Sequence, residues 1–162
     1  MRTILIASPK GGCGKTTVAT NLAAFYATAG KETVLIDCDR QGSSLHWAEK
    51  RAALAHPVLG MAGKRGSKVT VKVPSGTKRC IVDTAAGIRV AEVAELLDAA
   101  DALLIPVMPS VIDLEASEAF VYLTGFFSEN LSPSIAGQQS NAVADTLFPA
   151  VRDAVQMIRA GS

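Results

Sequence analysis

The chain has 162 residues, a length that fits a single domain with one hydrophobic core. Hydrophobic residues make up 49% of it and aromatic residues only 5%, which favours an α/β protein and excludes a disulfide-stapled or disordered chain. The formal net charge of +1 gives no global attraction to nucleic acid or membrane, so such a partner would have to be met by a local patch.

The cysteines and the N-terminal residues indicate the cellular compartment in which the protein works. Cys13, Cys38 and Cys80 are an odd number and lack CxxC spacing, which suits a reducing environment. The short apolar run at the N-terminus leads directly into glycines and leaves no room for a signal peptide. No apolar run approaches the roughly 20 residues that span a bilayer. We therefore expect a cytoplasmic protein.

The first half of the chain alternates short apolar runs with segments of helical spacing. Val18, Leu22, Phe25 and Tyr26 recur at helical spacing, and Gly30 is placed to end that helix. Ser43 or Ser44 is placed to cap a second helix, which would stop before Pro57. The predicted strands of this half are residues 3–7 and 33–36.

Residues 57–82 contain six basic and no acidic residues, the main charge anomaly of the sequence. Within this cationic stretch, residues 69–73 alternate between valine and polar side chains, which predicts a half-exposed edge strand. The second half then continues the alternation of strands and helices. It predicts strands at 80–83 and 102–107, and helices around 90–97 and 112–120.

Strands that alternate with helices at these lengths predict a mostly parallel sheet with helices on both faces. Ligands then belong at the carboxyl ends of the strands. We expect an α/β core over residues 1–127, a polar loop or linker over 128–141, and a C-terminal helix over 142–162 that packs on the core. The helix has too few basic residues for membrane docking.

The loop after the first strand carries the strongest motif, Lys10-Gly11-Gly12-Cys13-Gly14-Lys15-Thr16-Thr17. Its glycines allow backbone N–H groups to close around phosphate oxygens. Lys15 can reach the β- and γ-phosphates, Thr16 can place its hydroxyl on Mg²⁺, and Thr17 opens a helix whose N-terminus favours an anion. The motif predicts that ATP and Mg²⁺ bind here.

This motif resembles the deviant Walker A loop of the ParA/MinD family of P-loop ATPases, in which KGGxGK[ST]T replaces GxxxxGK[ST]. Pro9 stands here where the ordinary motif has glycine. The resemblance implies that Lys10 reaches across a nucleotide-sandwich homodimer to the phosphates held by the other subunit. A cation supplied in this way would stabilise charge during phosphoryl transfer.

Carboxylates follow two later strands. Asp37-Cys38-Asp39-Arg40-Gln41-Gly42 resembles the family's DxDxQG segment, although the family often has proline at the position of Arg40. The resemblance implies that Asp39 positions the attacking water near the magnesium shell and that Asp37 supports it. Without the resemblance, a strand-terminal turn with a helix cap explains these residues equally well.

Two further matches complete the candidate site. Asp83 ends an apolar strand and resembles the family's Walker B carboxylate, which holds Mg²⁺ directly or through water; Ala85 replaces a common proline nearby. The segment 105–113 resembles the family's post-strand loop near the nucleotide, so Asp113 is a candidate nucleotide contact. An early-helix carboxylate favoured by the helix dipole is the alternative for Asp113.

The resemblance covers about residues 1–123; the further strands that family members usually have, one of which helps hold adenine, are not visible after Phe127. We expect an ATPase with slow, partner-stimulated turnover whose dimer positions a plasmid, chromosome or protein compartment on nucleoid DNA. The alternatives are an ATP-binding interaction module with little hydrolysis, a MinD-like membrane-associated ATPase, or a metabolic P-loop enzyme. Non-specific DNA could meet the cationic stretch, which could equally be a solvated edge strand. A cargo adaptor that stimulates hydrolysis would be the protein partner.

Overall fold

The computed structural model describes residues 1–64, 72–108, 110–113 and 115–121. The chain divides into two compact units, Met1–Pro106 and Val107–Ser162, and each is described by itself. The first unit contains the sheet and three helices. In the second unit, residues 111–113 and 115–121 are helical, in agreement with the helix predicted around residues 112–120. None of the helices in these described ranges is long and apolar enough to cross a membrane.

The first unit is built on a five-stranded sheet in the order β3-β2-β4-β1-β5. Every neighbouring pair of strands is parallel, as the alternation of strands and helices predicted. In chain order the elements are β1 (Arg2–Ile6), α1 (Lys15–Thr28), β2 (Thr33–Asp37), α2 (Ser43–Arg51), β3 (Leu59–Ala62), β4 (Arg79–Asp83), α3 (Val90–Leu97) and β5 (Ala102–Leu104).

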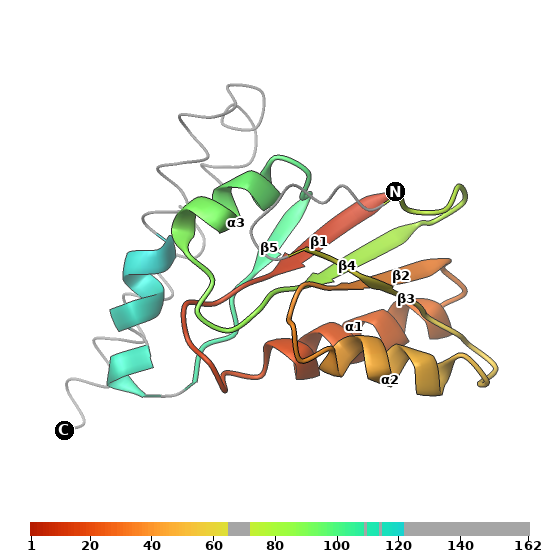
Figure 1. Cartoon of the computed structure of the whole chain (residues 1–162), viewed down its shortest axis with the longest axis horizontal. Coiled ribbons are helices and arrows are strands. Elements are labelled where there is room, and N and C mark those ends of the chain that lie inside the picture. The colour runs from red at the N-terminus through yellow and green to blue at the C-terminus, as the bar shows by residue number, and fades with distance from the viewer. Residues whose placement is uncertain (65–71, 109, 114, 122–162) are drawn as a thin grey trace. The chain divides into compact units, whose positions relative to one another are not determined.

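The helices cover both faces of the sheet because the chain reverses its direction of travel. The connections from β1 to β2 and from β2 to β3 move toward one edge, whereas the connection from β4 to β5 moves toward the other. Right-handed crossovers therefore put α1 and α2 on one face and α3 on the opposite face, as Figure 1 shows. The reversal lies between the adjacent strands β1 and β4, where an open α/β sheet forms its ligand crevice.

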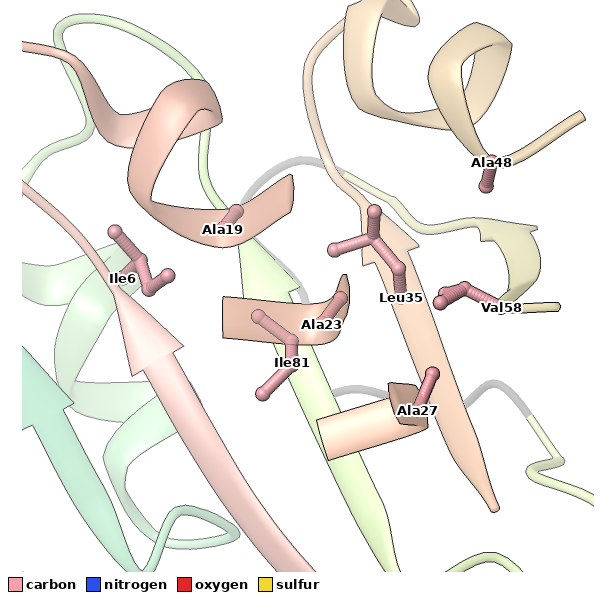
Figure 2. Packing of buried hydrophobic residues seen from close by; sticks show 8 residues of the cluster. All are labelled: Ile6, Ala19, Ala23, Ala27, Leu35, Ala48, Val58 and Ile81. Atoms are coloured by element: carbon pink, nitrogen blue, oxygen red, sulfur yellow. The ribbon is translucent and has the colours of Figure 1, made fainter. Parts of the chain in front are cut away.

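Small side chains bring α1 close to the sheet. Ala19, Ala23 and Ala27 recur every four residues, so they share one face of the helix, and all three are buried. Figure 2 shows them beside Ile81 of β4 and Leu35 of β2. This close packing fixes where the N-terminus of α1 lies relative to the strand ends.

Glycines lie at the C-terminal stop of α1 and at the start of α2. Helix α1 ends at Thr28, and Gly30 takes a φ of 71°, which confirms the stop predicted there. The prediction that Ser43 or Ser44 caps α2 is wrong. The N-cap of α2 is Gly42, with a φ of 65°, and since glycine has no side chain it cannot cap the helix with a side-chain hydrogen bond. A carboxylate oxygen of Asp37 accepts the hydrogen bond from Leu45 N instead, at 2.8 Å.

The cationic stretch differs most from expectation. Strand β3 at its start was not predicted, and it pairs with β2 as an edge strand. The edge strand predicted at residues 69–73 lies mostly outside the described residues, and residues 72 and 73, which are described, are not in a strand. Strand β5 ends at Leu104, three residues earlier than expected. The predicted linker and C-terminal helix lie outside the described residues.

Candidate nucleotide-binding site

The candidate site lies at the carboxyl edge of the sheet, next to the point where the chain reverses. Ile6 pairs in register with Asp83, and Asp83 pairs in register with Asp37. Residues in register on parallel strands face the same side, and Ile6 packs in the core beneath α1. The two carboxylates therefore face the side of the sheet that carries α1 and α2.

The phosphate loop joins β1 to α1 at this edge. Gly12 and Gly14 take φ values of 76° and 87°, a backbone region that L side chains rarely adopt. Gly14 is the N-cap of α1 and provides no side-chain cap, and the first turn of α1 contains no acidic residue. The amide groups at this N-terminus are thus arranged to receive an external anion.

Lys15 is buried inside the loop, with only 6% of its surface exposed. Its ammonium Nζ donates to the carbonyl oxygen of Lys10 at 2.6 Å and lies 3.7 Å from Cys13 Sγ. The carbonyl is a neutral acceptor, so it compensates only part of the cost of burying this charge. A phosphate anion in the loop would compensate the remainder.

The flanking residues of the motif have different exposures. Lys10 is half-buried, and its N–H approaches Ser8 Oγ at 3.5 Å. Thr16 is half-buried and Thr17 exposed, while Cys13 is buried with its thiol 3.5 Å from the carbonyl oxygen of Lys10. Gly11 is exposed, and a Cβ there would lie 3.6 Å from Ala86 Cβ. The motif therefore runs from an exposed glycine segment into the first turn of α1, where the Lys15 side chain is buried.

Asp83 is the buried carboxylate of the site, 1% exposed. Burial raises its pKa from 3.8 to about 6; the hydroxyls of Thr16 and Ser44 lower the pKa, Asp37 raises it, and Lys15 lowers it. Both hydroxyls therefore act on the Asp83 carboxyl group as hydrogen-bonding groups would. Within the described part of the chain, however, neither Asp83 Oδ1 nor Ser44 Oγ makes a hydrogen bond of regular geometry.

Asp37 and Asp39 have distinct positions. Asp37 is buried, and its two carboxylate oxygens accept hydrogen bonds from Asp39 N at 2.9 Å and from Leu45 N at 2.8 Å. Asp39 is half-buried in the turn that follows, and its Oδ1 accepts from Gln41 N at 3.0 Å. Asp37 therefore holds both the turn that carries Asp39 and the start of α2. Its support of a catalytic Asp39 stays a prediction.

Cys38 and Cys80 lie near the carboxylates but have no reactive character. Burial raises the pKa of each thiol to about 11, and the nearby charges of Asp37 and Asp83 add to the effect at Cys38. A thiol with so high a pKa stays protonated at neutral pH and is a poor nucleophile. All three cysteines of the chain are free.

The structure brings together most of the predicted site. Lys15, Thr16 and Asp83 meet at the N-terminus of α1, whereas the hydrogen bonds of Asp39 remain within its own turn. Asp113 belongs to the second unit, where its N–H donates to Ser110 Oγ at 3.2 Å. Ser44 was not recognised as a site residue, because a serine near a helix start normally indicates a cap.

A metal ion at this site would need phosphate oxygens as additional ligands. Among the described residues, no group of three or more His, Cys, Asp or Glu side chains could hold a metal by itself. A buried carboxylate oxygen without a partner and a threonine hydroxyl are hard oxygen ligands of the kind that Mg²⁺ prefers. The residues present therefore fit a magnesium ion shared with a bound nucleotide.

A glycine loop between a parallel strand and a helix, a buried lysine within it and a carboxylate on the neighbouring strand define a P-loop nucleotide-binding protein. The family model described as "CobQ/CobB/MinD/ParA nucleotide binding domain" matches residues 4–159. The chain belongs to this family, and to its ParA-like P-loop ATPases.

Related proteins support the assignment. A Maintenance of carboxysome distribution protein A from Gloeobacter kilaueensis is 38% identical over 114 residues, which are 70% of this chain and 52% of that protein. The corresponding Halothiobacillus neapolitanus protein is 35% identical over 118 residues, 71% and 54% of the two chains. The Chromosome-partitioning ATPase Soj of Thermus thermophilus is 52% identical over 74 residues, 37% of this chain and 30% of that protein.

Solved structures share the fold. Apo McdA from Cyanothece superposes with a TM-score of 0.63 at 19% identity, over 81% of this chain and 68% of that one. A plasmid partition protein from Borrelia burgdorferi gives the same TM-score at 13% identity, over 99% of both chains. The chain spans about half the length of the carboxysome-distribution proteins it matches.

Proposed function

We propose that this protein is an ATPase that binds ATP with Mg²⁺, forms a nucleotide-sandwich homodimer and acts as a positioning or partitioning switch for a cargo on nucleoid DNA. The observation that carries the proposal is the combination at one strand edge of the buried Lys15 ammonium, the uncapped N-terminus of α1 and the unpartnered oxygen of Asp83. The relatives named for carboxysome distribution and chromosome partitioning support the positioning role.

The loop residues would bind the triphosphate. Backbone N–H groups from Gly11 to Thr17 surround the phosphates, and Lys15 exchanges the Lys10 carbonyl for a phosphate oxygen, a stronger, charge-assisted partner. Thr16 and Asp83 would hold Mg²⁺ together with the phosphates. When bound, the metal neutralises charge that develops on the phosphate oxygens during transfer.

Hydrolysis requires a water molecule to attack the terminal phosphorus as the bond to the β-phosphate oxygen breaks. We assign the orientation of this water to Asp39, because Asp37 fixes the Asp39 backbone through a hydrogen bond of 2.9 Å. Lys10 of a second copy would stabilise the charge on the leaving phosphate. In this subunit Lys10 is half-buried in the loop, and its carbonyl oxygen accepts a hydrogen bond from Lys15 Nζ at 2.6 Å.

The cationic stretch is the proposed contact for DNA phosphates. Lys64, Lys72 and Lys78 are exposed, whereas Arg79 stacks over the ring of Tyr26 at 5.0 Å. Lys64 follows the carboxyl end of β3, whereas Lys78 precedes the amino end of β4. Because the strands are parallel, the two lysines lie at opposite ends of the strands of the sheet. Of these three described lysines, Lys64 alone follows the carboxyl end of a strand, the end of the sheet at which the candidate nucleotide site lies and where a nucleotide-controlled DNA contact would lie.

A single-turnover hydrolysis assay with and without DNA tests this function. We expect the wild-type chain to hydrolyse ATP slowly and DNA to be retained only with ATP. Asp39→Ala should abolish hydrolysis and keep ATP-dependent DNA retention, because it removes the residue that orients water. Lys10→Ala should keep nucleotide binding and lose stimulated turnover.

Two results would contradict the proposal in different ways. A wild-type chain that binds ATP normally but does not hydrolyse it would indicate an ATP-binding interaction module instead. A Lys10→Ala variant with an unchanged stimulated rate would remove the role of this lysine in the dimer. Exposed Lys31, which lies in the turn after α1, provides the matched control when changed to alanine.

A further inference from the structure

Ser44 is the second residue of α2, and it has no exposed surface. Its hydroxyl oxygen makes no hydrogen bond of regular geometry with any part of the chain that the structure describes. Buried hydroxyls without a partner are rare in folded proteins, because water is lost and nothing replaces it. An alanine at this position would avoid the free-energy cost of burying a hydroxyl without a hydrogen bond. The presence of the hydroxyl therefore needs a functional explanation.

The second unpartnered buried oxygen is close by. Asp83 Oδ1 lacks a hydrogen bond among the described residues, and the Ser44 hydroxyl lies near enough to lower the pKa of that carboxyl group. A hydroxyl donates one hydrogen bond and an ionised carboxylate only accepts. The two groups are therefore chemically complementary.

The backbone fixes Ser44 at this location. Gly42 starts α2 with a φ of 65°, and Asp37 holds the N–H of Leu45, the residue directly after Ser44. Asp37 is in register with Asp83 on the adjacent strand. The start of α2 is thus tied to the strand end beside Asp83, while the preceding Ser43 is exposed.

We propose that Ser44 is a positioning residue whose hydroxyl donates to Asp83 in the nucleotide-loaded protein and holds the carboxylate in the orientation that binds Mg²⁺. The inference rests on the proposed function, because it concerns the same metal. If Ser44 acts in this way, the N-terminus of α2, which Asp37 of β2 holds, sets the orientation of the Asp83 carboxylate at the end of β4.

A purely structural role for Ser44 leads to opposite expectations. If the residue only fills space, alanine should satisfy it, and metal binding should not change. If the hydroxyl orients the carboxylate, alanine should weaken the metal while the metal-free protein keeps its stability. Residues that orient metal ligands typically change metal affinity by roughly 10- to 100-fold when they are removed.

The experiment uses the full chain, a non-hydrolysable ATP analogue and Mn²⁺ as a probe for the magnesium site. The free Mn²⁺ signal in electron paramagnetic resonance gives the metal affinity of the nucleotide-loaded protein. For Ser44→Ala we expect an affinity lower by roughly 10-fold. Nucleotide affinity in EDTA and the metal-free melting midpoint should not fall. Ser43→Ala, the exposed neighbour, should match the wild type in all three measurements.

Each other outcome overturns the proposal. Unchanged Mn²⁺ affinity in Ser44→Ala would remove the positioning role and leave the proposed function intact. A fall in the metal-free melting midpoint or in nucleotide affinity in EDTA would show that Ser44 is needed for the fold or the loop. Wild-type nucleotide binding that is independent of metal would overturn both this inference and the proposed function.

Discussion

The metal-binding role proposed for Asp83 comes with a cost to the stability of the folded protein. Its carboxyl group is buried at the end of β4, and no hydrogen bond from the described residues reaches its Oδ1. Burial therefore raises its pKa to about 6. At neutral pH the metal-free protein holds a buried negative charge, which a bound cation would stabilise.

This charge should make the stability of the metal-free protein depend on pH. Because the pKa is raised from 3.8 in the unfolded chain to about 6 in the folded one, the folded state binds the proton more tightly. The contribution of Asp83 to stability is thus fully present below pH 3.8 and is lost as pH rises through about 6. The loss is roughly 3 kcal/mol.

Asp83→Asn tests this directly, because asparagine has nearly the same shape and no charge. In EDTA without nucleotide, we expect the variant to be more stable than the wild type at pH 8 by up to about 3 kcal/mol. The advantage should shrink toward pH 4. Urea unfolding at several pH values measures it, with exposed Asp98→Asn as the control. An advantage of equal size at pH 5 and pH 8 would contradict this account of Asp83.

Some site residues could be predicted from the sequence and others could not. The loop residues and Asp83 follow from local pattern, since each needs only a strand end and a spacing. The two hydrogen bonds of Asp37 are local, because they reach residues two and eight positions further along the chain. The approach of Ser44 to Asp83 instead joins segments about 40 residues apart. Local pattern carries no information about such a contact.

At the scale of the elements, helix α2 packs closely against strand β3 at Gly60. A Cβ at Gly60 would lie 2.8 Å from Ala48 Cβ and 2.9 Å from Leu45 Cδ1, both of α2. Real Cβ atoms essentially never come so close to other atoms, so α2 packs directly on the backbone of this edge strand. This contact holds the helix that carries Ser44.

Gly60→Ala should therefore destabilise the protein by about 1–3 kcal/mol, the usual cost of overpacking. Chemical denaturation measures the change. Combining it with Ala48→Gly removes one of the two close contacts, so the double variant should be more stable than the sum of the two single effects predicts. Strict additivity, or a Gly60→Ala variant as stable as the wild type, would show that α2 can move away from β3 without cost.

The sequence predicted strands β2 and β4, which end at the candidate site, but it did not predict the edge strand β3. β2 and β4 are continuous buried runs. β3 has only four residues, Leu59–Ala62, which are half-buried or exposed and include a glycine, so no apolar alternation marks it. Its position depends on pairing with β2, which is a tertiary contact.

At the scale of the whole first unit, the parallel sheet and its strand reversal explain why the glycine loop and Asp83 lie at the same end of neighbouring strands. The glycine loop follows β1, and Asp83, the proposed metal ligand, ends β4; these two strands flank the reversal. The alternation of strands and helices was enough to predict this edge as the ligand site. The strand order itself was not predicted, since it requires knowing which strands pair.

Equilibrium binding of a fluorescent ATP analogue, with Mg²⁺ or with EDTA, tests the central claim most directly. We expect the wild-type chain to bind the nucleotide tightly only with Mg²⁺. Lys15→Ala should lose at least roughly 10-fold in affinity, because a charge-assisted hydrogen bond to phosphate contributes about 1.5–3 kcal/mol. The exposed-site control Lys31→Ala should bind like the wild type. Binding that is equally tight in EDTA, or unchanged in Lys15→Ala, would contradict the assignment of this loop as an ATP–magnesium site.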